Sequence, residues 1–252
     1  MTLIIDSGYT QWDPSLITTA LWLDAADAST VTTVSGAVSQ WNDKSGNGRN
    51  ATQATIGLRP AFASNGLNSK SVISFTYAAG ASQSLGVTLD NYQSAFILYS
   101  NTNDVAFTTP LGSLYSITGD SGARGGAYHG HSNSTQFFST LYTRSATLNG
   151  QNFSNGTSIG TGLSTARPAS PAIFSHVATA AFTAQNGLRI LGADGASSLD
   201  RGITGIIAEV IMLSGAASTD TRQRIEGYLA HKWGLTANLP NDHPYKINAP
   251  AP

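Results

Sequence analysis

The fold is decided by residues 203–235, ITGIIAEVIMLSGAASTDTRQRIEGYLAHKWGL, in which a strand pattern leads directly into a helix pattern. Residues 206–213 form a dense apolar run that a single charge, Glu209, interrupts. Because β-branched residues are frequent in this run, it predicts a buried central strand. A charge inside such a strand is costly unless it is paired, so Glu209 needs a partner.

A helix of about residues 219–233 is predicted by the second half of the same stretch. Ser218 or Thr219 can cap its first turn, and Gly234 can end it in a left-handed conformation. Four apolar residues recur at helical spacing and form one stripe: Ile225, Tyr228, Leu229 and Trp233. We therefore expect the helix to pack on the sheet to which the preceding strand belongs.

The remainder of the chain is a succession of short apolar segments and turns. Two pairs of turn residues predict hairpin turns: Ser35–Gly36 and, after a strand at 140–148, Asn149–Gly150. A second hairpin-like stretch is expected between Arg59–Pro60 and Asn65–Gly66. Strands and helices do not alternate, so a parallel sheet is not expected. The pattern predicts an all-β, two-sheet antiparallel sandwich with one C-terminal helix.

The 252 residues are long enough to bury a sizeable core, and we interpret residues 20–252 as one domain. Residues 1–19 are interpreted as a lead-in segment that docks through three apolar side chains: Trp12, Leu16 and Ile17. Three of the tryptophans are expected in the core rather than in contact with a ligand: Trp22, Trp41 and Trp233.

Charged residues make up only 11% of the chain, and the net charge is −1. Attraction to nucleic acid is therefore not expected, and no apolar run is long enough for membrane insertion. The sequence contains no cysteine. Its first residues lack the basic start and apolar core of a signal peptide. We expect a virion location with release by lysis, or otherwise an extracellular or cell-surface location.

Several segments together carry a family resemblance: ALWLDAADAST (20–30), VSQWNDKSGNGRNATQ (38–53), RPAFASNGLNSKSVISF (59–75), IAEVIMLSG (207–215) and RQRIEGYLAHKWGLTANLPNDHPYK (222–246). They resemble the laminin-G-like, concanavalin-A-type jelly-roll domains of phage structural and bacterial surface proteins, over nearly the whole chain. The resemblance implies a jelly-roll fold, carbohydrate or protein binding, and in some members a bound calcium ion.

This resemblance leads us to expect a non-enzymatic virion structural or receptor-binding protein, such as a tail-fibre, spike or capsid-decoration protein. Its partners would be a cell-surface glycan or other virion proteins, and it would form a homo-oligomer such as a trimer. A bacterial surface adhesion module and a polysaccharide-degrading glycoside hydrolase are the alternatives. Glu209 and Glu226 are the only glutamates, and one lies in the strand and the other in the helix. They do not form the carboxylate pair that glycoside hydrolysis uses.

A polar, aromatic loop in the middle of the chain is the candidate ligand-binding site. It comprises Tyr115, Arg124, Tyr128, His129, His131 and Asn133. Sugars take hydrogen bonds from such side chains and stack on aromatic rings. The two histidines could instead grip a transition metal, and an exposed loop without a ligand is the third interpretation.

Hard oxygen ligands suited to calcium come from two early loops and from the central strand. The candidates are Asp24, Asp27, Asp43, Asn47 and Glu209. The alternative is turn chemistry, in which Asp and Asn side chains bond to the backbone of their own loop. Glu209 could equally form a structural ion pair or fasten the loop at 42–50, with Lys44, Arg49 or Arg201 as its partner.

Overall fold

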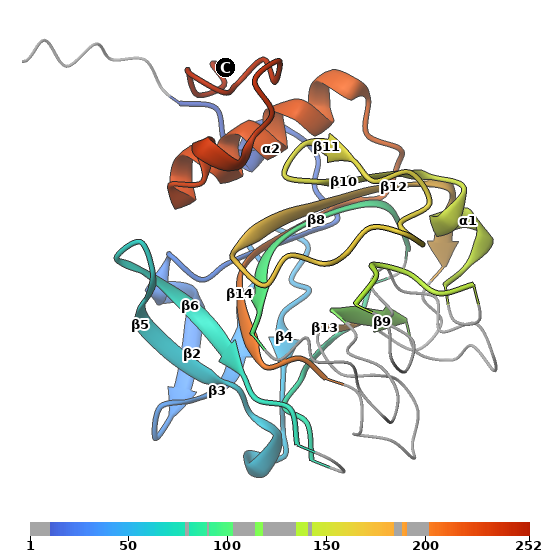
Figure 1. The fold of residues 1–252 in the computed structure, drawn as a ribbon. Coiled ribbons are helices and arrows are strands. Elements are labelled where there is room, and N and C mark those ends of the chain that lie inside the picture. The colour runs from blue at the N-terminus through green and yellow to red at the C-terminus, as the bar shows by residue number, and fades with distance from the viewer. Residues whose placement is uncertain are drawn as a thin grey trace, which may run out of the picture.

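The computed structural model describes residues 11–78, 81–89, 91–102, 114–117, 135–140, 143–183, 188–190 and 202–252. The described chain is mostly β, with one long helix near the C-terminus (Figure 1). The strands are β1 (Leu21–Asp24), β2 (Val31–Val34), β3 (Ala37–Trp41), β4 (Ala51–Thr52), β5 (Ala61–Leu67), β6 (Lys70–Phe75), β7 (Leu85–Val87), β8 (Asn91–Asn101), β9 (Tyr115–Ile117), β10 (Gln151–Ser154), β11 (Thr157–Ser158), β12 (Ala172–Thr183), β13 (Leu188–Ile190) and β14 (Gly205–Leu213). The helices are α1 (Ser145–Leu148) and α2 (Thr219–Trp233), and short 3-10 turns occur at Pro14–Leu16, Ala28–Thr30, Ile56–Leu58 and Thr236–Asn238.

Fourteen strands of the described chain join one sheet, in the order β11-β10-β12-β8-β14-β6-β5-β3-β4-β7-β13-β9, with β1 added beside β14 and β2 beside β3. Every pair is antiparallel. The prediction of an antiparallel, mostly β fold with a C-terminal helix is therefore confirmed. In Figure 1 the long strands β8, β12 and β14 form a curved layer that α2 crosses on one side.

Both faces of this layer are apolar, because the side chains of a strand alternate between its two faces. On β8, Ile97 and Tyr99 join the interior cluster, which also contains residues of β3, β6 and β7. Phe96 and Leu98 point the other way and pack in the cluster beneath α2. A nearly continuous apolar run, as in β14, is the pattern that burial on both faces demands.

Helix α2 has the bounds that its sequence predicts. The Ser218 hydroxyl accepts the N–H of Thr221 at 3.1 Å and caps the first turn. Gly234 ends the helix at φ 69°, a left-handed conformation that glycine adopts without strain. The predicted stripe is buried against the sheet: Ile225, Tyr228, Leu229 and Trp233.

The hairpin predicted at Ser35–Gly36 is confirmed, with both residues at positive φ (53° and 80°) between β2 and β3. The prediction of a hairpin-like stretch between Arg59–Pro60 and Asn65–Gly66 is wrong. The single strand β5 runs through this stretch and through Asn65–Gly66, and the chain turns at Asn68–Ser69 (φ 47° and 63°). A Cβ atom at Gly66 would collide with the side chain of Val72, so this glycine serves a close approach of two strands.

The prediction of a strand ending in an Asn149–Gly150 turn is also wrong. Residues Ser145–Leu148 form the single helical turn α1, and the Asn149 N–H donates to the Ser145 carbonyl at 2.9 Å. A Cβ atom at Gly150 would meet the Val177 carbonyl oxygen, so glycine here again permits close backbone packing. The hairpin turn of this region lies at Asn155–Gly156 (φ 50° and 77°), between β10 and β11.

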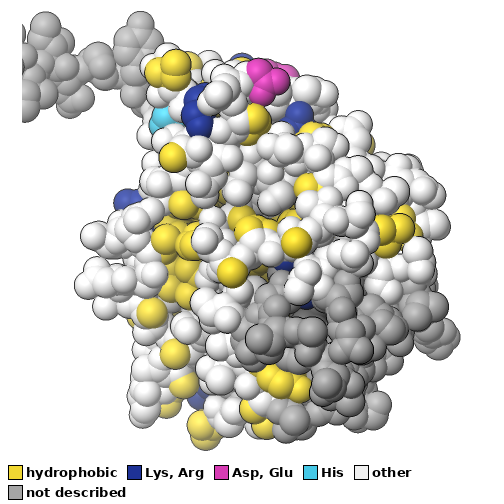
Figure 2. Space-filling view, in the orientation of Figure 1, with side chains coloured by type: hydrophobic (Ala, Val, Ile, Leu, Met, Phe, Trp, Pro, Cys, Tyr) yellow, Lys and Arg dark blue, Asp and Glu magenta, His cyan; other side chains and the backbone are white. Residues whose placement is uncertain are grey.

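The lead-in segment docks mainly through one of its three predicted anchors. Trp12 is buried, and its backbone N–H donates to the Pro250 carbonyl at 3.1 Å. Ile17 packs partly buried on the cluster beneath α2. Leu16 is 55% exposed, so its predicted role as an anchor is wrong. Few charged side chains appear on the face shown in Figure 2, as the composition predicts.

Candidate functional site

Glu209 faces α2 because β14 contains a β-bulge immediately before it. Ile207 pairs with Tyr99 of β8, whereas Glu209 pairs with Leu98, so β14 carries one extra residue at this point. An extra residue reverses the alternation of side chains along a strand. Glu209 consequently lies on the same face as Ile211, beneath the helix, and not in the interior cluster that contains Ile207.

Four donors surround the fully buried carboxylate of Glu209. Oε1 accepts the indole N–H of Trp22 at 2.8 Å and the hydroxyl of Tyr228 at 2.9 Å. Oε2 accepts the indole N–H of Trp233 at 2.7 Å and the ammonium of Lys232 at 2.7 Å. An indole N–H can only donate, so the ionised carboxylate is the form that satisfies all four contacts. Burial raises the pKa of Glu209, while the charge of Lys232 and the Trp233 N–H act in the opposite direction.

Lys232 links this carboxylate to a second one on β1. Its ammonium lies 2.7 Å from Asp24 Oδ1 and 3.0 Å from the Tyr228 hydroxyl oxygen, in addition to Glu209. The three protons of the ammonium therefore each have an acceptor. Burial, and next the negative charge of Glu209, raise the pKa of Tyr228, so its hydroxyl stays protonated and donates to Glu209.

The chain of charges continues into the loop at 42–50. Lys44 Nζ lies 3.1 Å from Asp24 Oδ2 and 3.0 Å from Asp27 Oδ2, and 4.7 Å from the centre of the Trp22 ring. Burial lowers the pKa of Lys44, but its bonds to Asp27 and Asp24 outweigh burial and raise it overall. The bonds from Ser29 and Lys44 lower the pKa of Asp27.

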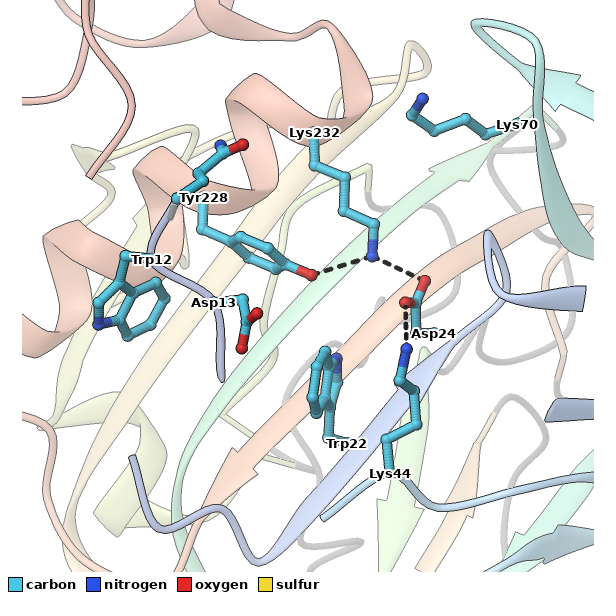
Figure 3. Close-up of a pocket in the computed structure, with 9 residues that line it drawn as sticks. Trp12, Asp13, Trp22, Asp24, Lys44, Lys70, Tyr228 and Lys232 are labelled. Atoms are coloured by element: carbon cyan, nitrogen blue, oxygen red, sulfur yellow. Dashed lines mark hydrogen bonds and ion pairs between the residues drawn. The ribbon is translucent and has the colours of Figure 1, made fainter. Parts of the chain in front are cut away.

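A pocket of about 420 Å³ opens beside this network, between the lead-in segment, β1 and α2 (Figure 3). Its charged lining residues are Asp13, Asp24, Lys44, Lys70 and Lys232, and Gln11 also lines it. Three aromatic residues complete the lining: Trp12, Trp22 and Tyr228. These three are only 3%, 7% and 6% exposed, so they shape the pocket but offer little free ring surface. Recognition in this pocket must therefore depend mainly on its polar groups.

The five residues predicted to bind calcium do not form one group. Asp24 and Glu209 share Lys232, and Asp27 shares Lys44 with Asp24. Asp43 binds its own loop, as turn chemistry predicts, through the N–H groups of Ser45 (2.9 Å) and Arg49 (3.0 Å) and, outside the loop, the N–H of Trp22 (3.0 Å). Asn47 donates its amide to the Thr19 carbonyl at 2.9 Å. Among the described residues, no group of three or more His, Cys, Asp or Glu side chains could hold a metal ion.

The ion pair expected at Glu209 is present, but neither Lys44 nor Arg49, the two predicted partners within the described residues, forms it. Lys44 binds Asp24 and Asp27, and Arg49 donates to the Ala20 carbonyl at 2.8 Å. Arg201 lies outside the described residues. The partner is Lys232, four residues after Tyr228 and therefore on the same helical face. The spacing of Tyr228 and Lys232, in a helix predicted to pack on the sheet of β14, was the sequence signal that could have identified Lys232 as the partner.

The second glutamate lies in a separate buried cluster between α2 and the C-terminal tail. Glu226 Oε2 lies 2.6 Å from Arg222 Nη1 and 3.3 Å from His243 Nε2. His243 Nδ1 accepts the N–H of Tyr245 at 3.2 Å, so Nε2 carries the proton that is donated to Glu226. The guanidinium of Arg222 also stacks 3.8 Å from the centre of the Phe153 ring. This cluster fastens the tail to the helix and does not border the pocket.

The polar, aromatic loop predicted to bind a ligand lies outside the described part of the chain, apart from the backbone of Tyr115. Arg124, Tyr128, His129, His131 and Asn133 lie outside the described residues, and Tyr115 lies in β9 with its side chain outside them.

Comparisons with known proteins find no matching family model, no matching curated protein and no matching solved structure. Among the described residues, no helix is both long and apolar enough to cross a membrane.

Proposed function

We propose that this protein is a non-enzymatic glycan-binding protein with a jelly-roll sandwich fold, acting as a structural or receptor-binding component of a virion. The packing supports the proposed fold. Trp41 of β3 and Phe75 of β6 lie in the same interior cluster as Tyr99 of β8 and Phe174 of β12, as expected where one half of a sheet folds over the other. The resemblance of residues 20–246 to domains of phage structural proteins supports the proposed role in a virion.

The pocket beside Glu209 carries the proposal of glycan binding. Its lining combines polar with aromatic side chains, and bonds between β1, β14 and α2 hold these side chains in place. A site held in place by its own supporting bonds loses little conformational freedom when a ligand binds. This combination suits a neutral or weakly charged sugar better than an apolar molecule or a nucleic acid.

Several polar groups at the pocket retain bonding capacity for a ligand. Asp13 uses one carboxylate oxygen to accept the N–H of Ser15 at 2.7 Å, and its second oxygen has no hydrogen bond from the described residues. Lys44 uses two ammonium protons on Asp24 and Asp27, which leaves a third. A ring with several hydroxyl groups can engage an acceptor and a donor on opposite sides of the same pocket.

The carboxylates of Asp24 and Glu209 already accept bonds from other side chains, which argues against glycoside hydrolysis in this pocket. Each oxygen of Asp24 is bonded to an ammonium group, and both oxygens of Glu209 are bonded to two donors. Hydrolysis requires one carboxyl that gives a proton and a second that attacks or activates water. Of the two described carboxylates that line the pocket, Asp13 and Asp24, Asp13 is the one with an oxygen not bonded to another described residue.

A glycan array probed with the purified protein tests the proposal, and Asp13→Asn tests the pocket. Asparagine preserves the cap on the 3-10 turn and removes the charge of the acceptor. We expect this variant to bind a captured glycan roughly tenfold more weakly, the effect of losing one charge-assisted bond. Arg59→Gln is the control, because Arg59 bonds to the carbonyls of Gln53 and Ala54 and does not line the pocket. An array without any bound glycan would contradict the proposal.

Glycan binding alone does not separate the virion proposal from the alternative of a bacterial adhesion module, because both bind glycans. The oligomeric state of the protein is the second observation that is needed. A virion component is expected to form a stable homo-oligomer, a trimer being the usual form for a tail-fibre or spike. Light scattering on the purified chain measures this directly.

A further inference from the structure

The charged groups at the base of the pocket are bonded to one another. Lys232 is bonded to Glu209 and Asp24, and Lys44 to Asp24 and Asp27. Their charges are largely neutralised, so they attract an ionic ligand only weakly.

Lys70 differs from the other two ammonium groups that line the pocket. Its side chain is half-buried, yet it makes no hydrogen bond or ion pair within the described residues. All three protons of its ammonium group are available to an acceptor that enters the pocket.

The position of Lys70 is fixed by the turn that precedes it. Asn68 and Ser69 form the β5–β6 turn, and the Asn68 side-chain amide donates to the Trp233 carbonyl at 2.6 Å, at the end of α2. This bond holds the turn against the last turn of α2. Lys232, the residue before Trp233 in that helix, lines the same pocket. In Figure 3 the side chain of Lys70 extends from the hairpin toward α2, on the side of Lys232 away from Trp22.

We propose that the pocket selects a glycan that carries an acidic group, a carboxylate or a sulfate, and that Lys70 is the residue that determines this specificity. The inference rests on the proposed glycan-binding function. An ammonium bonded to an anionic oxygen forms a charge-assisted hydrogen bond, which is stronger than a bond to a sugar hydroxyl. Lys70 would thereby gain the partner that the described chain does not give it.

The opposite charge of Asp13 sets the orientation of such a ligand. Asp13 lies on the lead-in segment, on the other side of Lys232 from Lys70 in Figure 3, and its spare oxygen accepts a hydroxyl but repels an anion. The acidic group must therefore lie toward the β5–β6 turn, with neutral hydroxyls toward residue 13. A monoacidic sugar, such as a uronic acid unit, fits this arrangement better than a polyanion.

The test uses an array of uronate-bearing, sialylated and sulfated glycans, each beside its neutral counterpart. The best acidic glycan and its counterpart are then titrated by calorimetry against the wild type, Lys70→Gln and Lys70→Arg. We expect Lys70→Gln to weaken binding of the acidic glycan about tenfold and to leave the neutral one unchanged. Lys70→Arg, which keeps the charge, should bind the acidic glycan within about threefold of the wild type. Raising the salt concentration from about 0.05 M to about 0.5 M should reduce the preference for the acid.

Lys246→Gln is the matched control, because it removes an ammonium that is bonded to the carbonyls of Ala237 and Leu239 and does not line the pocket. The inference is overturned if acidic and neutral glycans bind equally and Lys70→Gln changes neither. Loss of binding in Asp13→Asn would then still support the proposed function. If no glycan of either kind is bound, the proposed function fails, and this inference fails with it.

Discussion

At the level of single residues, Glu209 joins the helix that follows its own strand to Trp22, which lies 187 residues earlier in the sequence. Its oxygens are bonded to Trp22 on β1 and to three residues of α2, and Lys232 extends the contact to Asp24. A buried ion pair contributes little net stability compared with an apolar replacement, but removal of one partner is costly, since it leaves the other charge uncompensated. The network is therefore sensitive to small chemical changes at position 209.

We predict that Glu209→Gln lowers the free energy of unfolding by about 3 kcal/mol, measured by urea denaturation. The amide brings two N–H donors to a place where indole, hydroxyl and ammonium donors already converge, and it removes the charge opposite Lys232. Asp220→Asn is the matched control. The Asp220 side chain is 68% exposed and pairs with Arg224 on the helix surface, so its loss should cost less than about 1 kcal/mol. Equal losses in the two variants would show that Glu209 is not the centre of the network.

At the level of elements, the contact of α2 with the sheet combines apolar packing with hydrogen bonds to one carboxylate. We predict that Trp233→Ala destabilises the protein by about 3–5 kcal/mol, since the ring is fully buried. Trp233→Phe keeps most of the packing and loses the indole donor to Glu209, so about 1–3 kcal/mol should be lost. Thermal and urea denaturation of both variants separate packing from hydrogen bonding.

Trp41→Phe is the control for the hydrogen bond. Trp41 is also fully buried, but its indole N–H has no partner among the described residues. The substitution therefore removes volume and an unsatisfied donor together, and it should cost no more than about 1 kcal/mol. If Trp41→Phe and Trp233→Phe cost the same, the bond to Glu209 contributes nothing measurable to the attachment of α2.

The elements that local chemistry specifies were predictable, and those that depend on contacts were not. Ser218 and Gly234 predict the ends of α2, and the apolar run of β14 predicts that both faces of this strand are buried. By contrast, Asn65–Gly66 and Asn149–Gly150 carry the same dipeptide as a hairpin turn. Both glycines are needed because another chain segment approaches too closely for a side chain. An Asn–Gly dipeptide alone does not distinguish a hairpin turn from a position where two chain segments pack closely.

The site was predictable only in part, for a similar reason. The cost of burying a charge shows that Glu209 needs a partner, but the partner depends on which face of β14 the side chain occupies. Strict alternation after Ile207 would turn Glu209 toward the interior, and the bulge turns it toward α2 and Lys232. A bulge of one residue leaves no clear mark in an apolar run. The role of Lys70 likewise depends on a turn held to the end of α2 by Asn68.

At the level of the whole molecule, we expect the stability of the fold to depend on pH through a histidine remote from the pocket. His176 is fully buried on β12, with its ring stacked near Phe174. The Asn152 amide donates to the carbonyls of Thr147 and Gly160, so its oxygen accepts the proton on His176 Nδ1 at 2.9 Å. The Nε2 atom then has a lone pair and no partner among the described residues. Burial lowers the pKa of His176 from 6.5 to about 3.

This depressed pKa predicts that the protein loses stability as the pH falls. Between the unfolded pKa of 6.5 and the folded pKa of about 3, the unfolded chain binds a proton that the folded chain does not bind. The contribution of His176 is fully present above the unfolded pKa and declines below it, by about 2 kcal/mol between pH 7 and pH 5. Urea denaturation at several pH values should show this difference in the wild type, and it should be smaller by about the same amount in His176→Phe. His176→Gln, which keeps a donor for Asn152, provides the same comparison if the phenylalanine variant does not fold. Identical pH profiles in the wild type and the variant would show that other groups account for the acid sensitivity.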